Sequence, residues 1–227
     1  MNKNSYIPVW DLPLRVFHWL FMAAIIGAII SGKAEQLWLH ERFGMAVMGL
    51  VGFRLIWGFI GGRTARFAHF IKGPLQLLAV LRGILARRSE KHIGHSALGG
   101  WAVLALLLIP LWMAVTGSFS TDGILFDGPL AHLLPGQGKL FAELHEGGEP
   151  LLFLIIVLHL LALAVYWFWL RKNLIKPMVT GQGQAAAEQA AEQGAGLSAS
   201  RQVFGLGLLA LCLVLGQLAV AFKPGLF

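Results

Sequence analysis

Long apolar runs alternate with polar segments along the chain, and five runs are long enough to cross a membrane. A bilayer core about 30 Å thick requires about 20 apolar residues of helix. The runs lie at residues 14–31, about 40–60, 96–116, about 148–170 and 203–222. Pro110 falls inside the third run as a tolerated kink. The pattern predicts an all-α membrane protein with five spans.

The composition supports this interpretation and excludes other classes of protein. Hydrophobic residues make up 57% of the chain and charged residues 13%, against about 45–50% and about 25% in soluble domains. The chain is therefore neither an ordinary soluble enzyme nor a disordered protein. Its one cysteine, Cys212, rules out a disulfide framework and a zinc site built on cysteine pairs. Covalent c-type haem is also excluded, because there is no C-x-x-C-H motif.

The basic residues predict the orientation of the spans. With the N-terminus inside, the outer segments hold only Lys33, Arg42, Lys139 and Lys223, and Arg54 lies within a span. The other 13 of the 18 basic residues, and four of the 11 acidic ones, fall in the inner segments. The positive-inside rule then places the N-terminus in the cytoplasm and the C-terminus outside. This topology accounts for the net charge of +7, and no nucleic-acid partner is expected.

The connections between spans suggest three further features. In the inner connection, leucines at helical spacing within residues 74–85 indicate a helix on the membrane surface. The outer connection, residues 119–147, is rich in glycine and acidic residues and is a candidate docking surface. Residues 178–202 resemble a polar linker. We therefore expect a main domain at residues 1–177, this linker, and a C-terminal transmembrane helix at 203–227.

Two histidines of the fourth span indicate its chemistry. His145 and His159 are 14 residues apart, which places both rings on one helix face, about 21 Å apart along the axis. That distance is too long for one metal ion, whose ligands lie about 2 Å away. The spacing suits two large cofactors at different depths of the membrane.

Partners for both histidines occur at matching depths. His40 opens the second span at the outer edge, and His18 lies near the inner end of the first. Depth therefore predicts an outer pair, His40–His145, and an inner pair, His18–His159. Neutral imidazoles are good axial ligands of haem iron. Two such ligands leave no open position, so a haem held this way transfers electrons.

Other polar residues fit the same scheme. Arg54 lies 14 residues after His40, and a buried arginine at that depth is costly without a partner such as a haem propionate. Arg15 is a second candidate for this role. His95, at the inner end of the third span, could contact a propionate or a quinone, although a plain role at the helix end is an equal alternative.

Simpler interpretations remain for the same histidines. A single histidine inside a membrane is more often a packing residue than a ligand. The pairs His40-Glu41 and His145-Glu146 also raise the alternative of a carboxylate–histidine metal site, but adjacent residues point about 100° apart on a helix. His69, His92 and His132 lie in loops and are expected to be solvated.

Several motifs, in order, resemble the bacterial family that groups cytochrome b561 with the b-type cytochrome subunits of nickel–iron hydrogenases. The likeness extends over about residues 7–170. The motifs are Val9-Trp10-Asp11-Leu12-Pro13, Arg15-Val16-Phe17-His18-Trp19, Leu39-His40-Glu41-Arg42-Phe43-Gly44, Phe53-Arg54-Leu55-Ile56-Trp57-Gly58, Ala65-Arg66-Phe67, Lys72-Gly73-Pro74, Gly94-His95-Ser96-Ala97-Leu98-Gly99-Gly100, and His145 with His159.

The resemblance implies a four-helix bundle in the bacterial inner membrane that holds two haem b groups, with a fifth C-terminal helix added here. It implies His18, His40, His145 and His159 as axial ligands, and electron exchange between quinone and an outer partner. A periplasmic c-type cytochrome is the expected partner, because the acidic outer face suits a basic protein. Alternatives are a superoxide:quinone oxidoreductase, a hydrogenase subunit, and an anchor or transporter without redox activity. A homo-oligomer is a further alternative.

Overall fold

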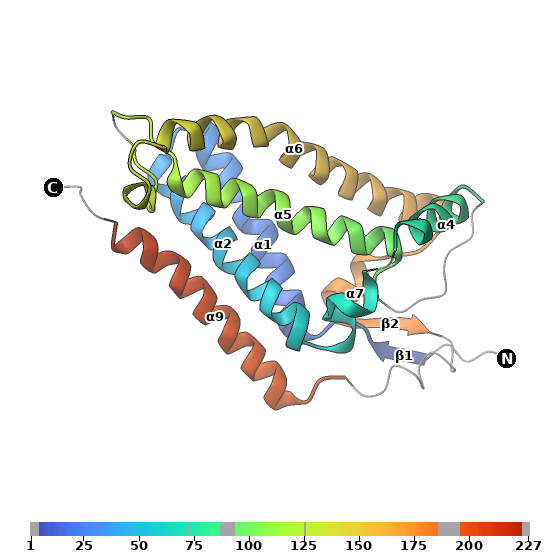
Figure 1. Cartoon of the computed structure of the whole chain (residues 1–227). Helices are drawn as coiled ribbons and strands as arrows, with labels where there is room; N and C mark the ends of the chain where they lie inside the picture. Colours follow the sequence, from blue (N-terminus) through green and yellow to red (C-terminus); the bar gives the residue numbers. More distant parts are fainter. Residues whose placement is uncertain (1–4, 72, 87–93, 125, 186–195, 224–227) are drawn as a thin grey trace. The chain divides into compact units, whose positions relative to one another are not determined.

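The computed structural model of the protein describes residues 5–71, 73–86, 94–124, 126–185 and 196–223. Five of its helices are long and apolar enough to cross a membrane (Figure 1). They are α1 (Leu12–Lys33), α2 (Leu37–Ile60), α5 (Ala97–Phe119), α6 (Gly138–Ala164, continued by a π-helical turn at Val165–Trp169) and α9 (Ala199–Ala221). The predicted all-α, multi-pass membrane architecture is confirmed.

The chain divides into two compact units. Unit 1 comprises Met1–Val16, Leu55–Ala105 and Ile155–Leu206. Unit 2 comprises Phe17–Arg54, Leu106–Leu154 and Gly207–Phe227. Each of the five long helices therefore contributes one end to each unit.

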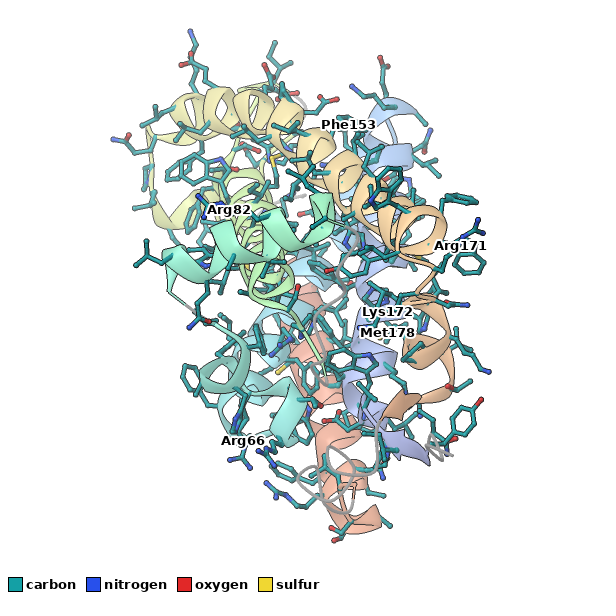
Figure 2. All side chains as sticks on the ribbon, turned by 90° about the vertical axis from the view of Figure 1, so that its right-hand side faces the viewer. Arg66, Arg82, Phe153, Arg171, Lys172 and Met178 are labelled. Carbon is teal, nitrogen blue, oxygen red and sulfur yellow. The ribbon has the colours of Figure 1, made fainter. Side chains whose placement is uncertain are left out.

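The charged residues separate between the two units. The sequence ranges of unit 1 include all 13 basic residues that were assigned to inner segments, among them Arg66, Arg82, Arg171 and Lys172 (Figure 2). Seven of the 11 acidic residues fall in unit 2. Lys3, Lys72, Arg87, Arg88, Lys91 and His92 lie outside the described residues. This separation agrees with the expected topology, while the orientation itself stays a prediction.

Short elements connect the long helices within unit 1. They are η1 (Arg63–Ala65), α3 (Phe67–Phe70), α4 (Pro74–Leu85) and α7 (Ile175–Thr180). The α4 helix has the bounds that its leucine spacing predicts, and Leu75 and Leu85 are each 80% exposed. These two side chains are available to a membrane surface.

A small antiparallel sheet was not expected from the sequence. Strand β1 (Ser5–Pro8) pairs with β2 (Gln182–Ala185), in a register that places Ser5 opposite Ala185. Residues 182–185 belong to the segment interpreted as a polar linker, and they form a strand that this interpretation did not include. A four-residue strand of glycine, glutamine and alanine has no apolar alternation to reveal it.

The start of α1 is fixed by Asp11. Its carboxylate accepts a hydrogen bond from the Leu14 backbone N–H at 2.9 Å, as an N-cap residue does. The same carboxylate accepts one from the indole N–H of Trp57, at 3.1 Å. Trp57 is 1% exposed. Within unit 1, Asp11 therefore joins the beginning of α1 to the end of α2.

In unit 2, α6 begins ten residues earlier than the sequence suggested. The Gly147-Gly148 pair and Pro150 resemble a helix break, yet the helix starts at Gly138 and runs through them. A Cβ atom at Gly148 would lie 2.6 Å from the Met113 sulfur, so glycine allows α6 to approach α5 closely. The outer connection is correspondingly shorter, and Glu143 and Glu146 lie on the helix.

Candidate haem site

Two predicted ligands, His40 and His145, come together in unit 2. His40 lies one turn into α2, and His145 lies in the early turns of α6. Their ring centroids are 5.8 Å apart, and the ring planes are nearly perpendicular at 82°. Both residues are half-buried. The outer pair that was predicted from depth is therefore a pair of neighbouring rings.

Each ring is held through its Nδ1 atom. Nδ1 of His40 lies 2.8 Å from the Ala28 carbonyl oxygen, and Nδ1 of His145 lies 2.8 Å from that of Met113. A carbonyl oxygen only accepts hydrogen bonds, so both Nδ1 atoms carry the proton. In the neutral ring, Nε2 then keeps its lone pair, which is the tautomer of a metal-ligating histidine.

Glycines make room for the two rings. A Cβ atom at Gly32 would lie 2.9 Å from His40 Nδ1, and one at Gly117 would lie 2.9 Å from His145 Cε1. Gly44 follows His40 by one helical turn, and a Cβ atom there would meet no described atom within 4 Å. Residues four apart share a helix face, so the space beside His40 on this face is open to a flat group.

The donor set fits haem iron. Two imidazoles bound to one metal ion through nitrogens about 2 Å away have ring centres roughly 6 Å apart, close to the observed spacing. No group of three or more His, Cys, Asp or Glu among the described residues could hold a metal ion. Glu41 is instead in an ion pair with Lys223, at 3.2 Å. The alternative of a carboxylate–histidine site therefore gains no support from the described part of the chain.

The inner pair and Arg54 lie on long helices, but His18 and His159 fall in different units. His145 and His159 both lie in α6, and His40 and Arg54 both lie in α2. The helical spacing that was assumed for each pair therefore holds. Arg54 is 2% exposed. His18 belongs to unit 2 and His159 to unit 1, and their pairing stays a prediction.

Arg15 and His95 both lie in unit 1. Arg15 donates from a terminal guanidinium nitrogen to the Val179 carbonyl oxygen, at 2.6 Å. His95 lies near the rings of Trp10 and Phe70, at centroid distances of 4.6 and 4.7 Å. These aromatic contacts give His95 a packing role, and its contact with a propionate or quinone stays a prediction.

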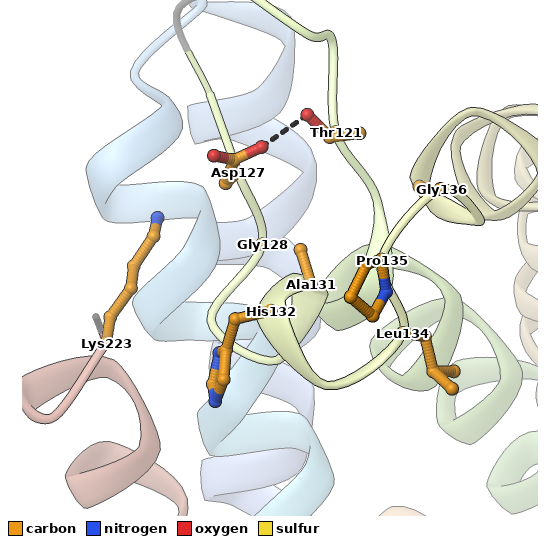
Figure 3. A pocket seen from close by; sticks show the side chains of 10 residues that line it. Thr121, Asp127, Gly128, Ala131, His132, Leu134, Pro135, Gly136 and Lys223 are labelled. Atoms are coloured by element: carbon orange, nitrogen blue, oxygen red, sulfur yellow. Dashed lines mark hydrogen bonds between the residues drawn. The ribbon is translucent and has the colours of Figure 1, made fainter. Parts of the chain in front are cut away.

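The prediction that the loop histidines are solvated agrees with the structure for the two that it describes, His69 and His132. His69 lies on α3 and His132 on a short 3-10 turn at Ala131–Leu133, and both are exposed. His132 lines a pocket of about 210 Å³ with Thr121, Asp127 and Lys223 (Figure 3). Ligand pockets usually measure about 300–1,000 Å³. This pocket is therefore smaller than most ligand pockets, and no predicted haem ligand lines it.

Sequence reasoning missed the groups that hold the ligands. The carbonyl oxygens of Ala28 and Met113 belong to the backbone, which carries no sequence signal. Gly32 and Gly117 are two among 28 glycines. The partner of Glu41 lies 182 positions away in the chain, and such a pairing cannot be identified before the fold is known.

Comparison with known proteins agrees with these observations. A family model described as prokaryotic cytochrome b561 matches residues 9–181. A probable Ni/Fe-hydrogenase B-type cytochrome subunit of Azotobacter chroococcum mcd 1 is 26% identical over 217 residues, covering 80% of this chain and 90% of the relative. The probable Ni/Fe-hydrogenase 1 B-type cytochrome subunit of Escherichia coli (strain K12) is 23% identical over 137 residues, covering 48% and 57%.

The family match covers well over half of the chain. The named relatives are b-type cytochromes, and the five apolar helices are those of a multi-pass membrane protein. The chain therefore belongs to the prokaryotic cytochrome b561 family, whose members are haem-binding membrane proteins of electron transport.

Proposed function

We propose that this chain transfers electrons across the bacterial inner membrane, between the quinone pool and a redox protein at the periplasmic face. Two b haems would be held by histidine pairs, His40–His145 near the outer surface and His18–His159 further in. The observation that carries the proposal is the meeting of His40 and His145 with both Nδ1 atoms bonded to carbonyls. The inner pair rests on sequence spacing.

The residues of the outer site suit electron transfer better than oxygen chemistry. The Ala28 and Met113 carbonyls fix the ring orientations, so both Nε2 atoms can serve as axial ligands. When bound, haem b supplies the one-electron redox chemistry. A haem held by both His40 and His145 would have no free coordination position for oxygen or another small ligand.

At the inner end, Arg54 and Arg15 would hold the propionates of the second haem. A guanidinium group matches a carboxylate through two parallel hydrogen bonds, and Arg54 is buried on α2 with 2% of its surface exposed. Quinone would exchange electrons near this haem, beside His95 and the basic segments. The N-terminus would then be cytoplasmic and the C-terminus periplasmic.

The charges of unit 2 favour a protein partner over superoxide. Lys33 forms an ion pair with Glu149 at 2.5 Å, and Lys223 forms one with Glu41 at 3.2 Å. Each pair neutralises one acidic and one basic residue, so the ranges of unit 2 keep their excess of acidic residues, seven against five basic ones. This excess does not attract an anion such as superoxide. A c-type cytochrome with a basic surface fits the acidic residues, and a hydrogenase is the second candidate partner because of the relatives' names.

The proposal is tested with purified protein in proteoliposomes. A quinol added to the oxidised protein should produce the absorption bands of reduced b haem, and a c-type cytochrome outside should then be reduced. The His145→Ala variant should keep reduction by quinol and lose most transfer to the outside acceptor. Absence of reduction by quinol, or unchanged transfer in this variant, would contradict the proposal.

A further inference from the structure

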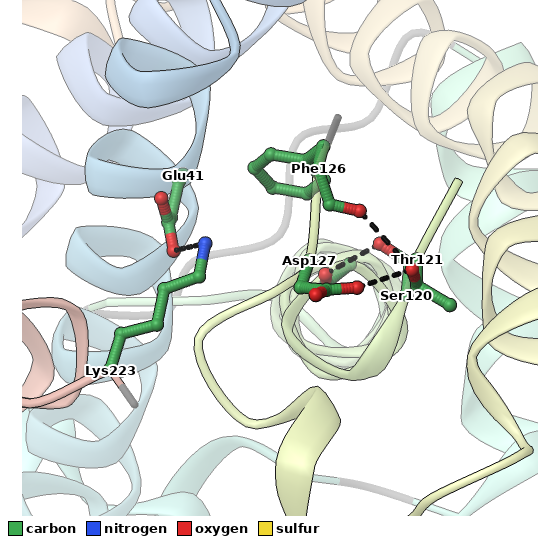
Figure 4. Close-up of polar contacts among 7 residues, drawn as sticks. Glu41, Ser120, Thr121, Phe126, Asp127 and Lys223 are labelled. Carbon is green, nitrogen blue, oxygen red and sulfur yellow. Dashed lines mark hydrogen bonds and ion pairs between the residues drawn. The ribbon is translucent and has the colours of Figure 1, made fainter. Parts of the chain in front are cut away.

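A buried ion pair lies beside the outer histidine site. The Lys223 ammonium nitrogen is 3.2 Å from the Glu41 carboxylate, and the two side chains are only 13% and 8% exposed (Figure 4). The same nitrogen lies 4.8 Å from the centre of the Phe126 ring, within cation–π range. Glu41 directly follows His40 in α2. A pair of fixed charges is therefore held next to a proposed haem ligand.

The helix that brings Lys223 to this place is tightly fixed in unit 2. A Cβ atom at Gly216 of α9 would lie 2.5 Å from the Met45 carbonyl oxygen of α2. One turn before the end of α9, the Gln217 side-chain amide donates to the Arg42 carbonyl oxygen at 2.9 Å. Such close backbone packing and side-chain bonding stabilise helix pairs in membranes. The position of Lys223 is consequently set by the packing of α9 on α2.

An exposed ion pair in the same unit provides a comparison. Lys33 and Glu149 are 2.5 Å apart, but their side chains are 65% and 40% exposed. Water and salt screen an exposed pair strongly, whereas buried charges act on their neighbours with less screening. Removing one partner of a buried pair also leaves an uncompensated charge. Both pairs lie near a proposed ligand, since Glu41 follows His40 in α2 and Glu149 follows His145 by one turn of α6. They differ mainly in exposure, so the buried pair should shift the potential of the site more than the exposed pair does.

We propose that Lys223, which follows the C-terminal helix, is a positioning residue for the outer haem: by compensating Glu41, it sets the charge beside His40 and thereby the reduction potential of that haem. The inference rests on the proposed function, since it requires a haem between His40 and His145. It assigns a role to a helix that lies beyond residues 9–181, the part matched by the family model.

The sign of the effect follows from electrostatics. The oxidised form of the site carries one more positive charge than the reduced form. In Lys223→Gln, the uncompensated carboxylate favours the oxidised form and lowers the outer potential. In Glu41→Gln, the uncompensated ammonium group raises it. A tenfold change in the reduction equilibrium in each case corresponds to about 59 mV for one electron. In the double variant, the outer reduction potential should return close to that of the wild type. Lys223→Arg keeps the charge and should have the wild-type potential.

The test is a spectroscopic redox titration of the full-length protein and these variants, with haem quantified in each. The step that is lost in His145→Ala identifies the outer haem. The matched controls are two single variants of the exposed pair, Lys33→Gln and Glu149→Gln. The inference would be supported if the outer reduction potential shifts in opposite directions in the two single variants. The shift should be absent in the double variant and smaller in the controls.

Two results are kept distinct by the haem measurement. The role of Lys223 would be overturned, and the proposed function left intact, by either of two results at full haem content. One is an unshifted outer potential in the variants of Lys223 and Glu41, and the other is a shift no larger than that of the exposed-pair variants. If His145→Ala loses no haem, the proposed function itself fails. If Glu41→Gln loses haem, the comparison of Lys223→Gln with Lys223→Arg decides, because both leave the ligand helix unaltered.

Discussion

At the scale of single residues, two backbone carbonyls determine what His40 and His145 can do. Each carbonyl accepts the Nδ1 proton of one ring, at 2.8 Å in both cases. The bond selects the tautomer and limits ring rotation, so the lone pair on Nε2 is available for a metal. The ligands are therefore prepared by helix packing, because the carbonyls belong to α1 and α5 and the histidines to α2 and α6.

The space around His145 gives a prediction at this scale. In Gly117→Leu, the new Cβ atom would lie 2.9 Å from His145 Cε1 and 3.0 Å from Nδ1, so the ring has to leave the Met113 carbonyl. We expect the variant to lose most of the outer haem, about half of the total, while the inner haem stays. Haem and protein quantified on the purified variant measure this loss.

Gly147→Leu is the matched control for that substitution. Gly147 is exposed on α6, and a Cβ atom there would meet no described atom within 4 Å. This variant should keep the haem content of the wild type. Equal haem content in the two leucine variants would contradict the importance of the space beside His145.

At the scale of elements, the lengths of the apolar runs in the sequence identified all five spans, because a lipid core requires about 20 apolar residues of helix. The start of α6 and the pairing of β1 with β2 were missed. Gly148 and Pro150 suggest a loop by composition, but α6 runs through both residues, and Gly148 lies close to Met113 of α5. The histidines were identified as candidates because ionisable residues are costly in membranes. Their carbonyl partners depend on which helices pack together.

The packing of α9 on α2 gives a second prediction. A leucine at Gly216 would bring its Cβ atom 2.5 Å from the Met45 carbonyl oxygen, which forces the helices apart. We expect Gly216→Leu to lower the free energy of unfolding by about 1–3 kcal/mol. Denaturant unfolding in detergent, followed by circular dichroism, measures this change. Gly207→Leu is the control, since a Cβ atom at Gly207 meets no described atom within 4 Å; equal losses would refute the proposed contact.

At the scale of the whole molecule, the charges divide with the two units. The ranges of unit 1 hold most of the lysines and arginines, and those of unit 2 hold most of the acidic residues. Each spanning helix has one end in each unit. The positive-inside rule then predicts that the ends in unit 1 face the cytoplasm. The histidine pair of unit 2 would then lie toward the periplasm, where the proposed partner is.

This orientation is tested by cysteine labelling. In a Cys212→Ala background, Lys139→Cys should react with a membrane-impermeant maleimide on spheroplasts. Arg63→Cys, at an exposed position of unit 1, should react only after the membrane is permeabilised. The reverse pattern would place the His40–His145 pair at the cytoplasmic surface and contradict the proposed direction of transfer.

The most direct test of the central claim is the number of haems in each chain. Haem b and protein should be quantified on the same purified sample, together with a reduced-minus-oxidised optical spectrum. We predict two low-spin b haems in the wild type and one in both His40→Ala and His145→Ala. Wild-type protein that is folded without haem, or histidine variants that retain both haems, would contradict the account.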